Sequence, residues 1–326
     1  MTGENLDFYI ADYQELFATA TPSPASIASL RSALLTQGIV GMRGVPKYRE
    51  HVQAFIAAAL EFAGLPSSIK AKYAPVRDAG DGLGYEIGAE QFQDSYGTWQ
   101  IDDKKASYYA AIPEIPANKW PLELDLRKPY LELASSMFET IKKIIHLLGI
   151  CATSGLDTKD CYGWGRMLHY HKEGELTNAN PLWCGSHVDH SVLTALIPSF
   201  YFQNGQAIEE PEEAGLYVLP NTQKEFVKIP NTDKNLMLFQ VGEFGQLMAN
   251  DEIKATRHLV KKALGSVERY TLALFFNAAN ESRIQSKSVL TLDERYLKNK
   301  FADGSISYGA WHEASLDRYR ARSGSY

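Results

Sequence analysis

The side chains best suited to chemistry gather in Cys184–Leu193, which reads CGSHVDHSVL. His187 and Asp189 are separated by one residue, and in an extended strand the side chains at positions i and i+2 lie on the same face. Of the eight histidines, only His258 lies in a later β-like run, far enough along the chain for a strand to return across a β-structure. Two imidazoles and one carboxylate on one side of a metal suit non-heme iron(II) and dioxygen chemistry. We therefore predict a metal site formed by His187, Asp189 and His258.

The His-x-Asp pair alone also fits a surface ion pair or a packed core histidine, because short motifs occur by chance. A second feature is Arg269-Tyr270-Thr271. The segment Lys262–Glu268 contains Gly265-Ser266 and predicts a hairpin that returns the strand of Arg269 beside the strand of His258. An inward Arg269 in so apolar a run requires an anion, and its planar fork matches a carboxylate, to which Thr271 adds a hydroxyl. An acidic cosubstrate that also reaches the metal explains both features.

The elements that must position these residues are helical in the first half of the chain and β-rich in the second. Helices are predicted where apolar residues recur at helical spacing between glycine or proline signals, over Pro24–Gln37, Lys47–Ala63, Pro66–Tyr73 and Leu131–Leu148. Ile39–Met42 predicts a strand, and Asp78–Gly97 a loop with one brief strand. Short β-like runs follow at Trp164–His171, Val192–Ile197, Leu216–Leu219, Phe226–Ile229, Leu236–Gln240, Arg257–Lys261 and Arg269–Phe276. Leu292–Ala302 is expected to be helical again.

This order predicts an α+β protein with a mainly β core, as a sandwich or a barrel. We divide the chain into an N-terminal helical and mixed region, residues 1–125, and a region of residues 126–326. The second region holds the long helix, the β-rich domain that carries the site, and a C-terminal helix.

Composition narrows the class of protein. The 326 residues carry a formal net charge of −6 and are 45% hydrophobic and 22% charged, which excludes disordered, collagen-like and coiled-coil chains. No basic stretch supports binding to nucleic acid or to a membrane surface. Three cysteines without a CxxC spacing, and an N-terminus without a basic and apolar leader, predict a reduced, cytoplasmic protein.

The combination of HVD, a distant histidine and an Arg-x-Thr pair resembles the iron(II)/2-oxoglutarate-dependent dioxygenases, specifically the subgroup that includes isopenicillin N synthase. Further stretches agree with that subgroup in the same order along the chain: LPSSIKAKYA (Leu65–Ala74), GLGYEIGAE (Gly82–Glu90), NKWP (Asn118–Pro121), GRMLHYH (Gly165–His171), GLYVLPNTQKEFVKIP (Gly215–Pro230) and VGEFGQLMAND (Val241–Asp251). The similarity extends over roughly Asp7 to Ala302. Several motifs in fixed order are more specific than any one of them.

The resemblance implies a distorted double-stranded β-helix, or jelly roll, with a helical N-terminal region wrapped on it. It also implies that the predicted triad holds Fe(II), and that Arg269 and Thr271 hold the distal carboxylate of 2-oxoglutarate. Tyr170 would donate a further hydrogen bond, although packing in a β-wall also explains this residue. With O2, the implied reaction couples decarboxylation of 2-oxoglutarate to C–H oxidation of a small molecule, by hydroxylation, desaturation or cyclisation. No nucleic acid, membrane or obligate protein partner is indicated.

Four positions depart from the usual pattern of the subgroup. Leu168 stands where many members carry Asn, His171 where Pro is common, Glu243 where Asp is usual, and Thr271 where Ser is more frequent. The segment Ser199–Ala214 is also longer than expected. It predicts an extra loop at a barrel rim, and its acidic run Glu209–Glu213 is expected to be solvated.

Other candidates have plainer explanations. His169 and His190 are out of phase with the neighbouring site residues and are expected to pack or to support the metal ligands from behind, not to bind the metal. Cys184 is expected to be a small buried hydrophobe. A group of aromatic residues in the N-terminal region either lines a substrate pocket or forms a domain interface: Tyr85, Tyr96, Trp99, Tyr108 and Tyr109.

Three alternative functions remain open from the sequence. One is an iron oxidase of the same fold that uses no 2-oxoglutarate, as in isopenicillin N synthase itself. Another is a zinc hydrolase at the same triad, which leaves Arg269 unexplained. The third is a non-catalytic binding module.

Overall fold

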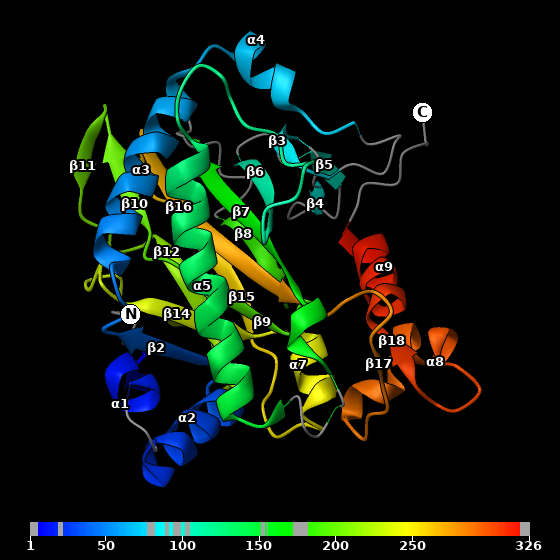
Figure 1. Ribbon diagram of the computed structural model, residues 1–326. Coiled ribbons are helices and arrows are strands. Elements are labelled where there is room, and N and C mark those ends of the chain that lie inside the picture. The colour runs from blue at the N-terminus through cyan, green and yellow to red at the C-terminus, as the bar shows by residue number, and fades with distance from the viewer. Residues whose placement is uncertain are drawn as a thin grey trace.

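A ten-stranded sheet forms the centre of the computed structural model, and helices cover it (Figure 1). The structure describes residues 6–18, 22–76, 82–88, 91–93, 99–101, 105–150, 154, 156–171 and 182–319. The continuous path of the sheet runs through β1 (Ile10–Asp12), β2 (Ile39–Arg43), β14 (Met237–Val241), β9 (Leu193–Leu196), β16 (Val267–Asn277), β7 (Tyr162–Tyr170), β6 (Lys105–Ile112) and β3 (Gly84–Ile87). The hairpin of β10 (Phe200–Gln203) and β11 (Gln206–Ile208) adds to β16. Strands from both sides of residue 125 therefore share one sheet.

A second sheet of four strands carries the predicted metal ligands. Its order is β13 (Val227–Lys228), β12 (Gly215–Leu219), β15 (Arg257–Lys261) and β8 (Leu182–His187), with antiparallel pairing. Residues of both sheets line one common pocket. Two further pairs of short strands lie apart from these sheets, β4 (Gln91–Gln93) with β5 (Trp99–Ile101) and β17 (Arg283–Ile284) with β18 (Ile306–Ser307).

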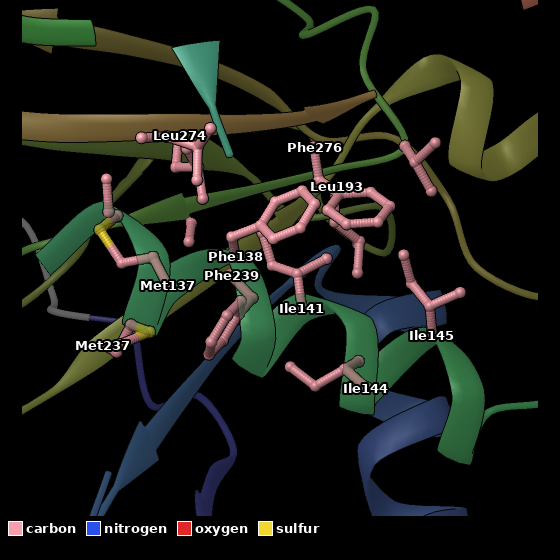
Figure 2. Close-up of a cluster of buried hydrophobic side chains, with 14 of the residues drawn as sticks. Met137, Phe138, Ile141, Ile144, Ile145, Leu193, Met237, Phe239, Leu274 and Phe276 are labelled. Carbon is pink, nitrogen blue, oxygen red and sulfur yellow. The ribbon is translucent and has the colours of Figure 1, made fainter. Parts of the chain in front are cut away.

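Helix α5 (Arg127–Leu147) packs its apolar stripe against the large sheet (Figure 2). The stripe arises because apolar residues recur every three or four positions, which places them on one helix face. The residues that meet at this contact are all buried: Met137, Phe138, Ile141, Ile144 and Ile145 on the helix, and Leu193, Met237, Phe239, Leu274 and Phe276 on the strands. The rings of Phe138 and Phe276 lie 4.9 Å apart between centroids, and truncating either ring would cost about 3–5 kcal/mol.

The remaining helices include those that the sequence predicts at Pro24–Gln37, Lys47–Ala63, Pro66–Tyr73 and Leu292–Ala302, and others that it does not predict. They are α1 (Tyr13–Phe17), α2 (Pro24–Thr36), α3 (Tyr48–Gly64), α4 (Ser67–Lys70) with η1 (Ala71–Tyr73), η3 (Thr158–Asp160), α7 (Glu243–Met248), η4 (Val289–Leu292), α8 (Glu294–Asn299) and α9 (Tyr308–Tyr319). The expected mixed α and β architecture with a large sheet at its core is confirmed. Within the described ranges no single helix is long and apolar enough to cross a membrane; α3 reaches that measure only together with α4 and η1, across a bend of 109°.

The structure corrects several expectations about the β-structure. The turn before Val267 does not return β16 beside β15, since the two strands belong to different sheets. The segment Ser199–Ala214 is not a loop, because it contains the β10–β11 hairpin. Asn204 and Gly205 both have positive φ (51° and 77°), the geometry that an Asn-Gly hairpin turn requires. Strand β6 and helix α9 were not predicted; nearly every side chain of β6 is buried, so it shows no alternation of apolar and polar residues.

Candidate functional site

His187, Asp189 and His258 come together at the edge where β8 meets β15. His258 is paired directly with His187 across the two strands. Asp189 Oδ1 lies 3.6 Å from Nε2 of His187 and 3.8 Å from Nε2 of His258. One candidate ligand atom from each residue lies within 4.8 Å of the other two. Strand β8 ends at His187, so Asp189 reaches the cluster from the following loop rather than from the extended strand that we expected.

The backbone of each strand orients its own histidine. Nδ1 of His187 is 2.8 Å from the carbonyl oxygen of Gly185, and Nδ1 of His258 is 3.1 Å from that of Thr256. In both cases the carbonyl belongs to the residue two positions earlier and accepts the Nδ1 proton. This contact leaves Nε2 of each ring as the ligand atom, which is the usual arrangement around a metal-binding histidine.

The carboxylate of Asp189 is oriented from the other sheet. Thr194 on β9 donates its hydroxyl proton to Oδ2 of Asp189 over 2.7 Å, so Oδ1 faces the two imidazoles. Asp189 is buried, with 6% of its surface exposed. A buried carboxylate needs such partners, because an isolated charge in the interior is strongly unfavourable.

The first turn of α7 supports the loop that follows Asp189. The backbone N–H of Glu243 donates to the carbonyl of Asp189 over 2.7 Å, and the amides of Gly242 and Phe244 donate to carbonyls further along the loop. The contact is close: a Cβ on Gly242 would lie 2.1 Å from the carbonyl oxygen of Ser191. A glycine is therefore required at Gly242, which explains part of the VGEFGQ stretch.

The C-terminal helices hold this support in place, through residues that sequence reasoning missed. Arg295 on α8 donates to both carboxylate oxygens of Glu243, over 2.5 and 2.9 Å, and also to Asp293 and Ser315. The Arg295 guanidinium lies over the ring of Trp311 on α9, 4.0 Å from its centroid, and Arg295 is only 4% exposed. No local sequence pattern points to Arg295. The one indication is that Glu243 supplies an acidic residue where the resembled subgroup usually carries Asp.

A second contact from α9 reaches the residue next to Asp189. Nε2 of His190 lies 2.9 Å from Nδ1 of His312. His190 therefore contacts a helix rather than the triad, in agreement with its predicted packing role. His169 does not line the pocket of the triad either. Its Nε2 lies 3.1 Å from Oε2 of Glu268, and its ring stacks on Tyr270.

Burial and mutual charge set the pKa values of the three candidate ligands. Burial alone would raise the pKa of Asp189, but the two imidazoles and Thr194 hold it below its usual value. Burial and the charge of His187 lower the pKa of His258 to about 4. Burial also tends to lower the pKa of His187, but the neighbouring Cys184 sulfur and Asp189 raise it to about 9. A divalent cation at this cluster would compete with protons for the imidazole nitrogens.

Arg269, Thr271 and Tyr170 line the same pocket as the triad. The pocket has a volume of about 80 Å³ and lies between the two sheets. Arg269 and Tyr170 are paired across β16 and β7, and the guanidinium carbon lies 4.7 Å from the Tyr170 ring centroid. The hydroxyl of Thr271 donates to the carbonyl of Ile197 over 3.1 Å. The predicted face of Arg269 and Thr271 is thus directed into the pocket.

The guanidinium of Arg269 has hydrogen-bond donors to spare. Arg269 is 5% exposed, and its Nε and Nη1 find no hydrogen-bond partner in the described part of the chain. A buried donor without a partner costs roughly 1–3 kcal/mol, and more when it is charged. A carboxylate is the anion best suited to accept from such donors. The donor set therefore fits an acidic ligand, and the His-Asp-His set fits iron(II).

Of three further candidates from the sequence, Cys184 lines the pocket, whereas Tyr108 and Tyr85 do not. Cys184 has its Sγ 3.8 Å from Nδ1 of His187; it is partly rather than fully buried, but it packs against a hydrophobic cluster that includes Trp183, as expected of a small hydrophobe. Tyr108 is fully buried, packs against Phe62 and does not line the pocket; its predicted substrate role is corrected to a core role. Tyr85 also packs near Phe62, outside this pocket.

Three aromatic candidates of the N-terminal region remain. Tyr109 lies near Trp164, with ring centroids 6.3 Å apart. Tyr96 and the side chain of Trp99 lie outside the described residues.

The acidic run Glu209–Glu213 is not fully solvated. Glu210 lines the pocket, accepts a hydrogen bond from Tyr201 over 2.8 Å, and pairs with Lys228 over 2.9 Å. Glu213 accepts from the backbone N–H of Leu264 over 2.9 Å. The run was predicted to be solvated because charge density alone gives no sign of a buried partner.

Comparisons with known proteins find similar structures but no similar sequences. No family model matches the sequence, and no curated protein does. Among solved structures, a 2OG-Fe(II) oxygenase family protein from Caulobacter crescentus is similar with a TM-score of 0.71 and 17% identity, over 96% of this chain and 99% of that one. A full-length Neurospora crassa protein in complex with alpha-KG gives 0.70 and 18%, over 98% and 99%. The dioxygenase for auxin oxidation of rice gives 0.66 and 19%, over 97% and 98%. At such identities the similarity shows that the chain shares its fold with these structures, over nearly the whole of each chain.

Proposed function

We propose that this chain is an iron(II)- and 2-oxoglutarate-dependent oxygenase that oxidises a C–H bond of a small molecule. One observation carries the proposal: a His-Asp-His cluster and a buried arginine with two unpartnered nitrogens line the same pocket. The first suits iron(II), and the second suits the distal carboxylate of a keto acid whose other end reaches the metal. Neither a zinc hydrolase nor a structural metal site requires such an arginine.

The proposed roles follow from the contacts. His187, Asp189 and His258 would hold iron(II) through the two Nε2 atoms and Oδ1. Iron(II) at this position supplies the redox chemistry that, with dioxygen, couples decarboxylation of 2-oxoglutarate to succinate and CO2 with oxidation of the substrate. Arg269 would bind the distal carboxylate of 2-oxoglutarate.

Two neighbours of Arg269 complete this end of the pocket. Tyr170 supports the guanidinium with its ring and offers its hydroxyl as a further donor. Thr271 can contribute its hydroxyl after turning away from the carbonyl of Ile197.

The pocket wall serves to exclude water. Apolar side chains from both sheets line the pocket that holds the triad and Arg269: Leu168, Leu196, Leu216, Val260, Ala273 and Phe275. Leu168, which replaces a polar residue in many members of the resembled subgroup, belongs to this wall. A dry wall protects a strongly oxidising centre from side reactions and strengthens the charge pairing at Arg269.

The subgroup, the domain bounds, the substrate class and the cellular location are inferred from the sequence. We infer that the two facing sheets form a distorted jelly roll of the isopenicillin N synthase-like subgroup. Residues 1–125 would form the N-terminal region and residues 126–326 the part that carries the site. A small-molecule substrate and a cytoplasmic location stay predictions. The similar Neurospora crassa protein was crystallised with thymine and with 5-formyluracil, which supports a small molecule as the substrate class.

The direct test is an anaerobic titration of the purified chain with iron(II) and then 2-oxoglutarate. We expect a visible charge-transfer band, and succinate formation once air and a substrate are admitted. The absence of both would contradict the proposal. Omitting 2-oxoglutarate from the assay separates this activity from an oxidase of the same fold, and metal analysis of the purified protein separates it from a zinc hydrolase.

A further inference from the structure

The β10–β11 hairpin brings two residues to the Arg269 end of the pocket that the proposed function does not yet use. Tyr201 is paired directly with Arg269 across β10 and β16 and is 1% exposed. Its hydroxyl donates to Oε2 of Glu210 over 2.8 Å. Glu210 lies beyond the hairpin in the acidic run and lines the same pocket as Arg269.

Several contacts hold Glu210 in this position. Nζ of Lys228 lies 2.9 Å from Oε1 of Glu210 and also donates to the carbonyls of Pro211 and Glu212, over 3.1 and 2.9 Å. The side chains of Lys228 and Glu210 are only 13% and 10% exposed. Gly215 makes room for the carboxylate, because a Cβ there would lie 2.8 Å from Oε2 of Glu210. A nearly buried ion pair held by this many partners is part of the fold, not an accident of a surface loop.

A tyrosine hydroxyl has a single proton, which limits how Tyr201 can contact Arg269. Tyr201 gives that proton to Glu210, so toward Arg269, its partner across β10 and β16, its oxygen can act only as an acceptor. Burial lowers the pKa of Arg269, but the nearby Tyr170, Tyr201 and Glu210 together raise it. The guanidinium lies over the ring of Tyr170, and Arg269 is the strand partner of Tyr201, while Nε and Nη1 have no partner among the residues described.

We propose that Tyr201, oriented by Glu210, positions Arg269 so that its unpartnered N–H donors are available to the distal carboxylate of 2-oxoglutarate. The inference rests on the proposed function and deepens it. Tyr201 and Glu210 are positioning residues: they act through Arg269 on one end of the cosubstrate and leave the metal end unchanged. The insertion at Ser199–Ala214 thereby acquires a role in selecting a dicarboxylate.

The test compares two keto acids of the same five-carbon length. 2-Oxovalerate lacks only the distal carboxylate of 2-oxoglutarate, so it offers Arg269 no anion to bind. Affinities for both are measured on the anaerobic, iron(II)-loaded protein from the charge-transfer band. Tyr201→Phe should weaken 2-oxoglutarate binding about tenfold, the scale of one hydrogen bond to a charged group, and leave 2-oxovalerate binding unchanged. An equal loss for both keto acids, or no loss for either, would overturn the inference.

A second pair of variants examines whether Glu210 acts through Tyr201. Glu210→Met removes the acceptor and should match the loss seen with Tyr201→Phe, whereas Glu210→Gln keeps an acceptor and should retain most of the selectivity. Combined with Tyr201→Phe, Glu210→Met should add no further loss. Additive losses would contradict the proposed path through Tyr201.

Two controls keep the outcomes separate. Glu212→Met alters an exposed acid of the same run and should change neither affinity. An unchanged iron(II) affinity of each variant shows that the fold and the metal end are intact. A wild-type protein that binds iron(II) but prefers 2-oxovalerate, or binds neither keto acid, would overturn the proposed function and this inference with it. If the wild-type protein prefers 2-oxoglutarate and every Tyr201 and Glu210 variant keeps that preference unchanged, only the inference is overturned.

Discussion

The two ends of the pocket are built in different ways. At the metal end, His187 and His258 are each oriented by a carbonyl two residues earlier in the same chain segment. At the other end, Arg269 lies over the ring of Tyr170 and is the strand partner of Tyr201, and both tyrosines come from neighbouring strands that are distant in sequence. Orientation at the metal end is therefore largely local, whereas orientation at the anion end depends on the assembled sheet.

The two ends also differ in how completely their polar atoms are satisfied. Asp189 uses Oδ2 for Thr194 and turns Oδ1 toward the imidazoles. Arg269 keeps two donors without a partner in the described structure. Because a buried charge without a partner is unfavourable, the anion end stands to gain more from its ligand, and its selectivity is the easier property to change by mutation.

Asp189→Ala should have the largest effect, at the metal end. It removes the only charged ligand, so metal affinity should fall by more than the roughly 10- to 100-fold that loss of a ligand's hydrogen-bonding partner causes. Turnover should be abolished. Cobalt(II) titration followed by visible absorption measures the affinity, and Asp160→Ala, at an exposed aspartate, is the control. Tight binding by the Asp189 variant would show that the three residues do not form the site.

Arg295→Met probes the support behind the metal end. It leaves Glu243 and Asp293 without their buried partner and should lower the free energy of unfolding by about 3 kcal/mol, with weaker metal binding. Lys298→Met is the matched control on the same helix, because its exposed pair with Glu294 is worth less than about 1 kcal/mol. Denaturant titration of both variants measures their free energies of unfolding. Equal stabilities would mean that α8 does not brace the loop of Asp189.

Arg269→Met should separate the two ends most clearly. The methionine fills similar space but offers no donor, so affinity for 2-oxoglutarate should fall about 100-fold, within the range for a charge-assisted pair. Cobalt(II) affinity should stay at the wild-type value. If metal binding weakened in parallel, the two ends would be coupled rather than independent.

Thr194→Val is expected to have the smallest effect. Valine keeps the shape of threonine but cannot donate to Asp189 Oδ2, so metal affinity should fall about tenfold. The affinity of the metal-loaded protein for 2-oxoglutarate should not change. An effect on 2-oxoglutarate alone would assign Thr194 to the anion end instead.

Much of the helical framework and the gathering of the triad could be predicted from the sequence. The stripe of α5 repeats at helical spacing, and Gly38 and Gly149, which follow α2 and α5, have the positive φ expected of a glycine after a helix. The His-x-Asp pair is a local feature, since two residues so close in sequence stay close in any extended segment. The Asn204-Gly205 pair is of a type that favours a hairpin turn, but our prediction for Ser199–Ala214 is a loop.

Other features had no local signature. The Gly265-Ser266 turn indicates that the chain reverses, but not that β16 joins a different sheet from β15. Strand β6 is buried along almost its whole length and so lacks alternation. Glu210, Arg295 and His312 are ordinary polar residues in the sequence, and only their partners in space distinguish them.

The sequence by itself determined which residue types could form a metal site, because ligand identity, the spacing of His187 and Asp189 and the helical periodicity are properties of neighbouring positions. The tertiary structure alone decided which strands face one another, that Arg269 is the strand partner of Tyr201, and how the C-terminal helices support Asp189. These contacts join residues far apart in the chain. Their formation depends on the packing of whole sheets and helices, which no short stretch of sequence encodes.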